Sequence, residues 1–387
     1  MSTVRIGLIG YGGMGSHHAR YIANGEVNGA ELAAVCDTDP ERIKVAREKH
    51  GDKVKYFGRP DELFAAKCVD GVLIATPHYD HPTLAIQAFE SGVHVLSEKP
   101  AGVYTKHVRE MNEKAKATGK VFGLMFNQRT VGAYQKLRDL VQSGELGELR
   151  RTNWIITNWF RSQAYYDSGG WRATWGGEGG GVLINQCPHN LDLWQWIAGM
   201  PKRVRAFCYF GKYHKIEVED DVTAYVEYAN GATGAFITTT GEAPGTNRLE
   251  ISGDRGKVVL ENGKLIFWRT RVPVSQFLRE TKESFATPEQ WACEVPTGRE
   301  GGGHKEITQG WVNAIAKGTP LMAPGEEGIR SLELSNAMLL SAWTDSWVSL
   351  PIDEEKFHAE LKKRIETSTF KKPSGGKAVD VAGSFNM

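Results

Sequence analysis

A glycine-rich turn between a strand and a helix is the feature that most constrains this chain. Residues 4–10 form a short apolar run that leads into Gly10-Tyr11-Gly12-Gly13-Met14-Gly15, and a helical pattern follows. In a G-x-G-x-x-G turn the first glycine permits the tight turn and the second lets the backbone approach a pyrophosphate. The third lets helix and strand pack closely, and the helix N-terminus attracts phosphate charge. The motif in this context favours a dinucleotide-binding α/β fold.

Asp37 indicates which dinucleotide to expect. It lies 22 residues after Gly15, at the end of the next predicted strand, 31–36. A carboxylate there accepts hydrogen bonds from the ribose hydroxyls of NAD and repels a 2′-phosphate, so NAD is expected and NADP is less favoured. Arg42 follows in a predicted helix, where it would face solvent or stack on adenine. An ordinary glycine turn, with Asp37 acting only as a helix cap, would leave the same local pattern.

The periodicity of apolar residues divides the chain in two. Up to about residue 125, strand-like runs alternate with helical segments such as 80–91 and 105–118, which predicts βαβ units and a parallel sheet. After about residue 147, strand-like segments joined by turns such as Asn230-Gly231 predict a largely antiparallel sheet. Helices at 188–197, 305–316 and 331–347 are expected to cover one face of that second sheet.

We therefore expect an α/β protein of two domains and a tail. Residues 1–125 would form a Rossmann domain with a doubly wound parallel sheet. Residues 126–370 would form an α+β domain with a large, mostly antiparallel open sheet for substrate binding and oligomerisation, and 371–387 a flexible tail. The free face of an open sheet needs a cover, which predicts a homodimer or homotetramer.

Composition argues against several classes of partner. Lys and Arg total 47 against 46 Asp and Glu, so the basic excess expected of proteins that bind nucleic acid or anionic membranes is absent. No apolar run reaches the roughly 18 residues of a membrane span, and the first residues lack the pattern of a signal peptide, so we expect neither. Five scattered cysteines without a C-x-x-C pair predict neither a disulfide framework nor a metal site. We expect a cytoplasmic protein without a metal.

Two further segments carry candidate chemistry. Ser97-Glu98-Lys99-Pro100 ends a buried strand with a carboxylate and an amine at the ligand edge of the predicted sheet, although a solvated strand end would explain it too. Three glycines at 179–181 lead to His189, in the first turn of a helix that Pro188 begins, with Asp192 on the same face. A lone helical histidine is more often structural. Oxidation of an alcohol, however, needs a proton acceptor near neutral pH, and histidine supplies one.

Together these motifs resemble the Gfo/Idh/MocA family, which includes glucose-fructose oxidoreductases and inositol dehydrogenases. The resemblance runs from residue 4 to about residue 350. It rests on the glycine turn, Ala75-Thr76-Pro77 with His81, Glu98-Lys99-Pro100, Trp171-Arg172 and the segment leading to His189. It implies an NAD(P)-dependent oxidoreductase that moves a hydride between the nicotinamide and a hydroxyl of a sugar, cyclitol or glycoside, or the corresponding keto-sugar.

The resemblance also implies roles for individual residues. Lys99 would lie beside the nicotinamide and stabilise alkoxide charge, and His189 would be the acid/base. The expected cofactor contacts are Gly10, Gly12, Met14, Gly15, Asp37, Arg42, Thr76, Pro77, His81, Glu98, Lys99, Asn127, Trp171 and Arg172. The expected substrate contacts are Lys99, Tyr165, Arg172, Asn185, His189 and His304. Tyr165 is included because it lies in the polar, Gly-rich loop of Arg172, and His304 because it follows three glycines, which the start of a helix would explain equally well.

Position 185 departs from the family pattern, which has an aspartate four residues before the histidine. Asn185 can hydrogen-bond a sugar hydroxyl but cannot take a proton or add negative charge. Loss of that carboxylate should lower the pKa of Lys99 and of His189 relative to aspartate-containing members. Proton transfer therefore falls to His189, or to Lys99 acting with it.

Two rival functions follow from the same residues. A hydrolase of this fold would oxidise a glycoside transiently, eliminate the aglycone and retain its NAD, which needs a second base; Tyr165 and His304 are the only hints of one. A binding protein that senses NAD or a sugar without turnover is mildly favoured by Asn185, while intact Lys99 and His189 argue against it.

Overall fold

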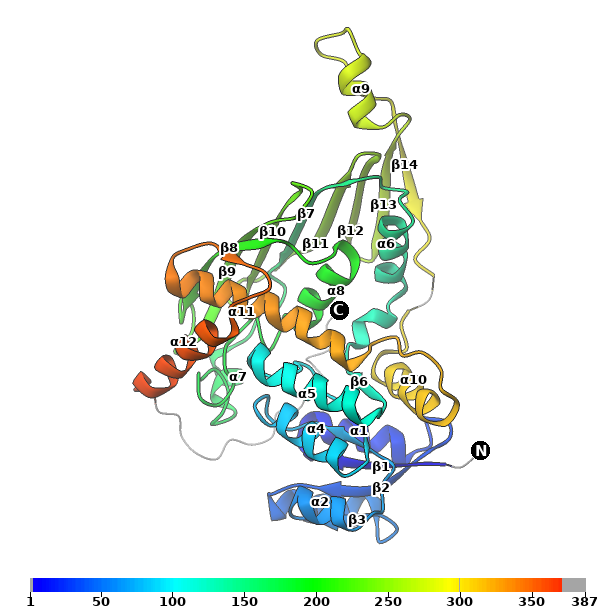
Figure 1. The fold of residues 1–387 in the computed structure, drawn as a ribbon, viewed down its shortest axis with the longest axis vertical. Helices are drawn as coiled ribbons and strands as arrows, with labels where there is room; N and C mark the ends of the chain where they lie inside the picture. Colours follow the sequence, from blue (N-terminus) through cyan, green and yellow to red (C-terminus); the bar gives the residue numbers. More distant parts are fainter. Residues whose placement is uncertain (1–2, 299, 371–387) are drawn as a thin grey trace.

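The computed structural model of the chain describes residues 3–298 and 300–370. Two β-sheets organise these residues, one from the N-terminal part of the chain and one from the remainder (Figure 1). The predicted tail at 371–387 lies outside the described residues. None of the described helices is long and apolar enough to cross a lipid bilayer.

The first sheet has six strands in the order β3-β2-β1-β4-β5-β6, and every neighbouring pair is parallel. The strands are β1 (Val4–Ile9), β2 (Ala30–Cys36), β3 (Lys55–Phe57), β4 (Gly71–Ile74), β5 (His94–Ser97) and β6 (Phe122–Leu124). The helices between them are α1 (Gly13–Ala23), α2 (Pro40–His50), α3 (Pro60–Ala65), α4 (Asp80–Glu90) and α5 (Thr105–Thr118). The central strands are apolar and largely buried, as expected where crossover helices cover both faces of a sheet.

The strand order reverses between β1 and β4. The chain proceeds from β1 outward through β2 to β3, and then crosses to β4 on the other side of β1. In doubly wound sheets a ligand crevice lies outside the carboxyl ends of the strands at this point. Gly10 follows β1, Thr76 follows β4 and Glu98 follows β5, so three of the sequence motifs meet at this edge. The predicted Rossmann topology is confirmed.

The second sheet has nine strands in the order β14-β13-β12-β11-β7-β10-β9-β8-β15. They are β7 (Leu149–Ile156), β8 (Arg203–Phe210), β9 (Glu219–Glu227), β10 (Thr233–Thr239), β11 (Asn247–Gly253), β12 (Gly256–Glu261), β13 (Lys264–Thr270), β14 (Gln290–Val295) and β15 (Val348–Ser349). All neighbours are antiparallel except β7 and β10, which are parallel. The predicted large, mostly antiparallel open sheet is confirmed.

Helices cover one face of the second sheet. The described helical segments after β6 are η1 (Asn127–Thr130), α6 (Gly132–Gln142), α7 (Gln163–Asp167), α8 (Pro188–Ala198), α9 (Val274–Glu280), α10 (Gly303–Lys317), η2 (Gly325–Glu327), α11 (Gly328–Thr344) and α12 (Glu354–Thr367). Trp194 of α8 packs on Phe236 of β10, with ring centroids 5.3 Å apart. The other face leaves Phe207, Tyr209 and Tyr225 exposed. Such a face suits the predicted homodimer or homotetramer, which stays a prediction.

Helix α10 corrects one expectation. The sequence places it over the second sheet, but it packs against β1, β5 and η1 of the N-terminal part (Figure 1). Its Trp311 is fully buried, and a Cβ added to Gly71 of β4 would lie 2.5 Å from the Trp311 ring. The apolar period of 305–316 predicts a helix with one buried face. The period does not indicate which sheet that face packs against. Here the face packs on the first sheet, where the glycine of β4 leaves room for the tryptophan of α10.

Candidate active site

The glycines of the turn fall into two groups: some are required by the protein's own backbone, and one faces open space. Gly10 has φ +93°, and a Cβ on Gly15 would lie 1.8 Å from the carbonyl oxygen of Gly10, so the protein's own backbone requires both. A Cβ on Gly12 would instead meet only Arg42 Nη1, at 3.8 Å. Helix α1 begins without a side-chain cap and without an acidic residue in its first turn. The turn therefore leaves room and backbone amides for an anion, which fits a pyrophosphate.

Replacing Gly15 by alanine should destabilise the fold and abolish NAD binding. The new Cβ would lie 1.8 Å from Gly10 O, whereas real contacts of this kind stay above 3.0 Å, so α1 must shift away from β1. Thermal unfolding and an NAD titration followed by tryptophan fluorescence measure the two effects. Gly12→Ala is the matched control, because its Cβ has space in the free protein. It should unfold at the wild-type temperature and still bind NAD more weakly; equal destabilisation of both variants would contradict this division.

Asp37 and Arg42 lie together beside the glycine turn. Asp37 is buried at the end of β2, where its Oδ2 accepts a hydrogen bond from the Tyr11 amide at 2.6 Å and its Oδ1 accepts one from the Asp39 amide at 2.9 Å. Arg42, half-exposed on α2, places Nη1 3.6 Å from Asp37 Oδ2. The two predicted adenosine contacts are therefore brought to the same side of the turn, with the carboxylate fixed by backbone amides and the arginine paired to it.

The carboxyl ends of β4, β5 and β6 bring the predicted nicotinamide contacts together. His81, fully buried in α4, lies 2.8 Å from Thr76 O through Nε2 and 2.8 Å from Pro100 O through Nδ1, so it joins the ends of β4 and β5. Burial lowers the pKa of His81. Asn127 follows β6, and its buried Oδ1 has no hydrogen-bond partner among the described residues. An unsatisfied amide oxygen at this edge suits a polar ligand such as a carboxamide. Of the other predicted cofactor contacts, Pro77 follows β4 and Met14 lies in the first turn of α1.

Glu98 is the centre of a buried polar cluster that the sequence does not reveal. Its Oε1 lies 2.7 Å from His18 Nε2, and His18 Nδ1 lies 2.6 Å from the Tyr21 hydroxyl. Burial works to raise the pKa of Glu98, but the His18 hydrogen bond and the positive charges around it hold that pKa at about 2. His304 stacks edge-on with His18 at 5.6 Å, and burial lowers its pKa to about 4. His304 thus lies beside Glu98, on the cofactor side of the site.

Lys99 and His189 converge at the same edge. Lys99 Nζ donates a hydrogen bond to the backbone oxygen of Asn185 at 2.9 Å. Burial lowers the pKa of Lys99, and the negative charge of Glu98 opposes this. Burial also lowers the pKa of His189 well below its usual value, and the Lys99 ammonium adds to the effect. His189 is 9 % exposed, and its Nδ1 has no hydrogen-bond partner among the described residues. A neutral imidazole beside an ammonium group can accept a proton while the cation stabilises an oxyanion.

Aromatic and cationic side chains border this pair. Arg172 lies 4.6 Å from the Tyr165 ring and 4.7 Å from the Trp171 ring, and its Nη1 donates to the Tyr165 hydroxyl at 2.8 Å. Trp171 packs edge-on against buried His78, with centroids 5.5 Å apart. Burial raises the pKa of Tyr165. The predicted ligand contacts of this loop, Tyr165, Trp171 and Arg172, therefore lie together. Tyr165 stays neutral and can form hydrogen bonds.

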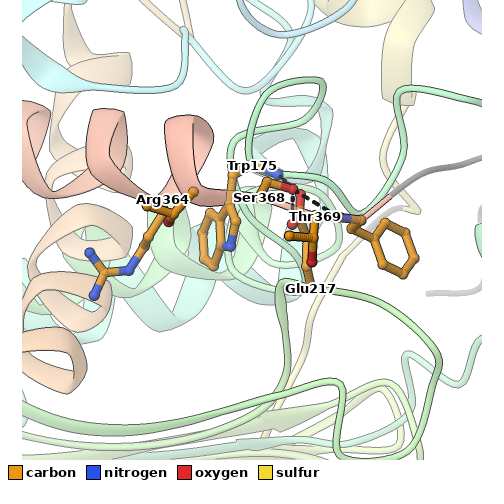
Figure 2. A pocket seen from close by; sticks show the side chains of 7 residues that line it. Trp175, Glu217, Arg364, Ser368 and Thr369 are labelled. Carbon is orange, nitrogen blue, oxygen red and sulfur yellow. Dashed lines mark hydrogen bonds between the residues drawn. The ribbon is translucent and has the colours of Figure 1, made fainter.

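A cavity of about 420 Å³ lies on another side of the same loop (Figure 2). Glu217 accepts a hydrogen bond from the Trp175 amide at 2.8 Å through Oε1, and one from the Ser368 hydroxyl at 2.5 Å through Oε2. These bonds fasten the loop to the chain that follows α12, as Figure 2 shows. Lys99 and His189 do not line this cavity. We therefore interpret the residues around it as a structural support for the loop, not as part of the active site.

Two acidic residues differ from the sequence-based picture. Asp192 does not serve His189, because its carboxylate is held by buried Arg129 in a forked ion pair, with distances of 2.7 and 2.6 Å. Glu178 was not predicted at all, although it is buried beside Asn185 and bonded to it. The only sequence signal was an acid within the glycine run Gly176-Gly177-Glu178-Gly179-Gly180-Gly181. A charged residue in such a run is usually solvated.

Family models match both parts of the chain. A family model described as "Oxidoreductase family, NAD-binding Rossmann fold" matches residues 4–126. A second, described as "GFO/IDH/MocA C-terminal domain", matches residues 134–259. The two matches cover the sheet edge with Lys99 and the segment with His189.

Individual relatives agree with the family models. D-glucoside 3-dehydrogenase of Escherichia coli is 31 % identical over 251 residues, which cover 59 % of this chain and 68 % of the relative. Inositol 2-dehydrogenase of Corynebacterium glutamicum is 30 % identical over 200 residues, 51 % of this chain and 55 % of the relative. This second match thus spans little more than half of the relative's length.

Solved structures match over most of their length. WlbA dehydrogenase from Chromobacterium violaceum, in complex with NADH and UDP-GlcNAcA, is 28 % identical with a TM-score of 0.78, covering 91 % of this chain and 97 % of that one. Levoglucosan dehydrogenase, in complex with NADH and L-sorbose, covers 91 % of this chain and 100 % of that one, with a TM-score of 0.75. At 21 % identity the latter shows the shared fold alone.

Proposed function

Because the chain belongs to the Gfo/Idh/MocA family of NAD-binding oxidoreductases, we propose that it oxidises a hydroxyl of a sugar, cyclitol or glycoside, or reduces the corresponding keto-sugar. The observation that carries this proposal is the convergence of Lys99 and neutral His189 at the carboxyl edge of the dinucleotide-binding sheet. The names of the relatives, a glucoside 3-dehydrogenase and an inositol 2-dehydrogenase, support this substrate class.

The chain's residues divide the binding of cofactor and substrate between them. Bound NAD supplies the hydride acceptor, at C4 of its nicotinamide. Gly12 and the N-terminus of α1 hold the pyrophosphate, and Asp37 binds the ribose hydroxyls. Thr76, Asn127 and the Glu98 cluster shape the nicotinamide side. Tyr165, Trp171 and Arg172 offer aromatic faces and a cation to the substrate.

The proton and the developing charge are handled by separate groups. His189 takes the hydroxyl proton, since its low pKa keeps the ring neutral at physiological pH. The Lys99 ammonium, held by the Asn185 carbonyl, stabilises the alkoxide oxygen as its charge develops. In the reverse direction the same two groups polarise the keto oxygen and return the proton.

Replacing Asp37 by serine should weaken the preference for NAD over NADP. The ratio of the two dissociation constants should fall at least about tenfold, because a like-charge contact with a 2′-phosphate costs on the order of 1.4 kcal/mol or more. Arg42, 3.6 Å from both Asp37 and Asp39, would then have one carboxylate partner fewer and be freer to pair with the phosphate. Fluorescence titrations with both cofactors measure the ratio. Asp61→Ser is the matched control: Asp61 pairs with Arg59 at the surface, in the first turn of α3, and its substitution should leave the ratio unchanged.

A screen for NAD reduction with cyclitols, aldoses and glycosides tests the proposed function. At least one compound should produce NADH in stoichiometric amount. Release of an aglycone without net NADH would instead identify the hydrolase, although Tyr165, kept neutral and bonded to Arg172, is poorly suited as its second base. Tight NAD binding with no turnover on the whole panel would identify a sensor and refute the proposal.

A further inference from the structure

Glu178 is a buried carboxylate to which neither the sequence motifs nor the proposed mechanism gives a role. Its side chain is 1 % exposed, in the loop between Trp171 and the glycines that precede α8. Its Oε2 accepts a hydrogen bond from the Ala173 amide at 2.5 Å, and its Oε1 accepts one from the Asn185 side-chain amide. Burial disfavours the charged form of a carboxyl group, whereas the N–H donors on both of its oxygens favour it.

The bond to Glu178 fixes which way the Asn185 amide faces. An ionised carboxylate only accepts hydrogen bonds, so Asn185 must present its nitrogen to Glu178. The amide oxygen is then left as an acceptor for another group. Without the carboxylate the amide could rotate by half a turn, since its nitrogen and oxygen have nearly the same shape.

Glu178 also reaches Lys99 through the same residue. Lys99 Nζ is held at 2.9 Å by the backbone oxygen of Asn185, whose side chain is bonded to Glu178. The charge of Glu178 is close enough to oppose the lowering of the Lys99 pKa that burial causes. A chain of contacts therefore runs from the loop that carries Arg172, through Glu178 and Asn185, to Lys99.

We propose that Glu178 is a positioning residue of the active site, which orients Asn185 and supplies beside Lys99 the negative charge that the amide at position 185 cannot. This inference rests on the proposed role of Lys99 in oxidoreduction. The Glu178 carboxylate accepts hydrogen bonds from Ala173 and Asn185, and its effect on the reaction is expected to pass through Asn185 and Lys99.

Other ionisable groups face Lys99 and Glu178 and are unchanged in the test. They are Glu98 after β5, Arg161 and Arg172 of the loop, His78 before α4, His81 in α4, Tyr165 and Tyr166 of α7, Cys187 and His189 at the start of α8, Glu219 of β9 and His304 of α10. Among the described residues, the Asn185 side chain donates its hydrogen bond to Glu178. A change that follows the 178–185 pair therefore reports on Glu178.

Exchanging the two groups tests the proposal. Glu178→Gln removes the charge and should lower kcat by about 10- to 100-fold, because Asn185 and Lys99 lose their fixed positions. It should also move the alkaline limb of the pH profile of kcat to lower pH, since Lys99 then loses its proton more easily. The double variant Glu178→Gln/Asn185→Asp returns one carboxylate to the pair, with the glutamine nitrogen as its donor. Its kcat and its alkaline limb should return toward those of the wild type.

A second measurement does not need a substrate. The rate at which a small acylating reagent labels Lys99, followed by mass spectrometry across pH, reports the titration of its amine. In Glu178→Gln, labelling of Lys99 should begin at lower pH than in the wild type. In the double variant, its pH dependence should return toward that of the wild type. If no sugar is turned over by the wild type, the proposed function fails, and this titration still tests Glu178 separately.

A second carboxylate that is bonded to this loop provides the control for Glu178. Glu217→Gln removes another carboxylate that accepts from a backbone amide of this loop, and it should change neither kcat nor Lys99 labelling. If Glu178→Gln does not fold, Asn185→Asp replaces it: two carboxylates in contact must share a proton, so this variant should show an additional titration in its pH profile. Any of three outcomes would overturn the proposal. Lys99 could titrate in Glu178→Gln as it does in the wild type, the double variant could fail to recover, or Asn185→Asp could show no additional titration.

Discussion

Replacing Lys99 by alanine should lower kcat by about 10²- to 10³-fold, the usual cost of removing one group that stabilises an oxyanion. The Lys99 ammonium lies in a buried site, where a charge acts more strongly than in water, and Asn185 holds it in place. The two arginines near Lys99 are engaged elsewhere, since Arg172 is bonded to Tyr165 and Arg161 to the Phe160 backbone oxygen. Steady-state kinetics and an NAD titration should show the loss in kcat, with a much smaller change in NAD affinity.

Lys106→Ala provides the comparison for Lys99. Lys106 lies on α5, where it pairs with Glu355 at the surface, 2.7 Å away. Its removal should leave kcat at the wild-type level. A folded Lys99→Ala enzyme with a rate within about threefold of the wild type would contradict the assignment of Lys99 to the transition state.

Replacing His189 by alanine should lower kcat by about 10²- to 10⁴-fold, the range for loss of a general acid or base. The pH profile of the wild type carries a second signature. Burial and Lys99 lower the pKa of His189 well below its usual value, so the neutral, active base persists as pH falls through the ordinary range of histidine. The wild-type rate should therefore stay constant through neutral pH and fall only in more acidic solution.

The acidic limb identifies His189 as its source. In His189→Ala this limb should disappear from the residual rate, because the group that is protonated there has been removed. His358→Ala is the control: His358 stacks on Tyr104, with centroids 4.6 Å apart, and its loss should leave the whole profile unchanged. A wild-type acidic limb in folded His189→Ala would show that another group titrates.

Much of the fold could be predicted because local patterns carry it. In the first sheet, apolar strands alternate with helices after a glycine turn, and Asp39 caps α2 with Pro40 in its first turn, as its sequence indicates. The edge strand β14 could not be predicted, because its residues are almost all exposed and lack alternation. The predicted position of α10 over the second sheet was wrong, because the apolar face of a helix does not indicate which sheet it packs against. Long-range packing, here Trp311 over Gly71, decides that.

The site was predictable where topology alone brings residues together. Parallel strands end at one edge, so Thr76, Glu98 and Lys99 had to meet there. The partners of these residues were not predictable. His18 occupies the interior of a helix with nothing to show that it points at Glu98. Glu178 lies in a glycine-rich loop, and only the folded loop reveals that it is buried against Asn185.

Transfer of deuterium tests the central claim most directly. A substrate found in the NAD-reduction screen is deuterated at the carbon that bears the reacting hydroxyl and incubated with NAD and enzyme. The account predicts one deuterium on the reduced nicotinamide with wild-type enzyme, and little transfer with Lys99→Ala or His189→Ala. A product whose nicotinamide carries no deuterium, or full transfer by both variants, would contradict it.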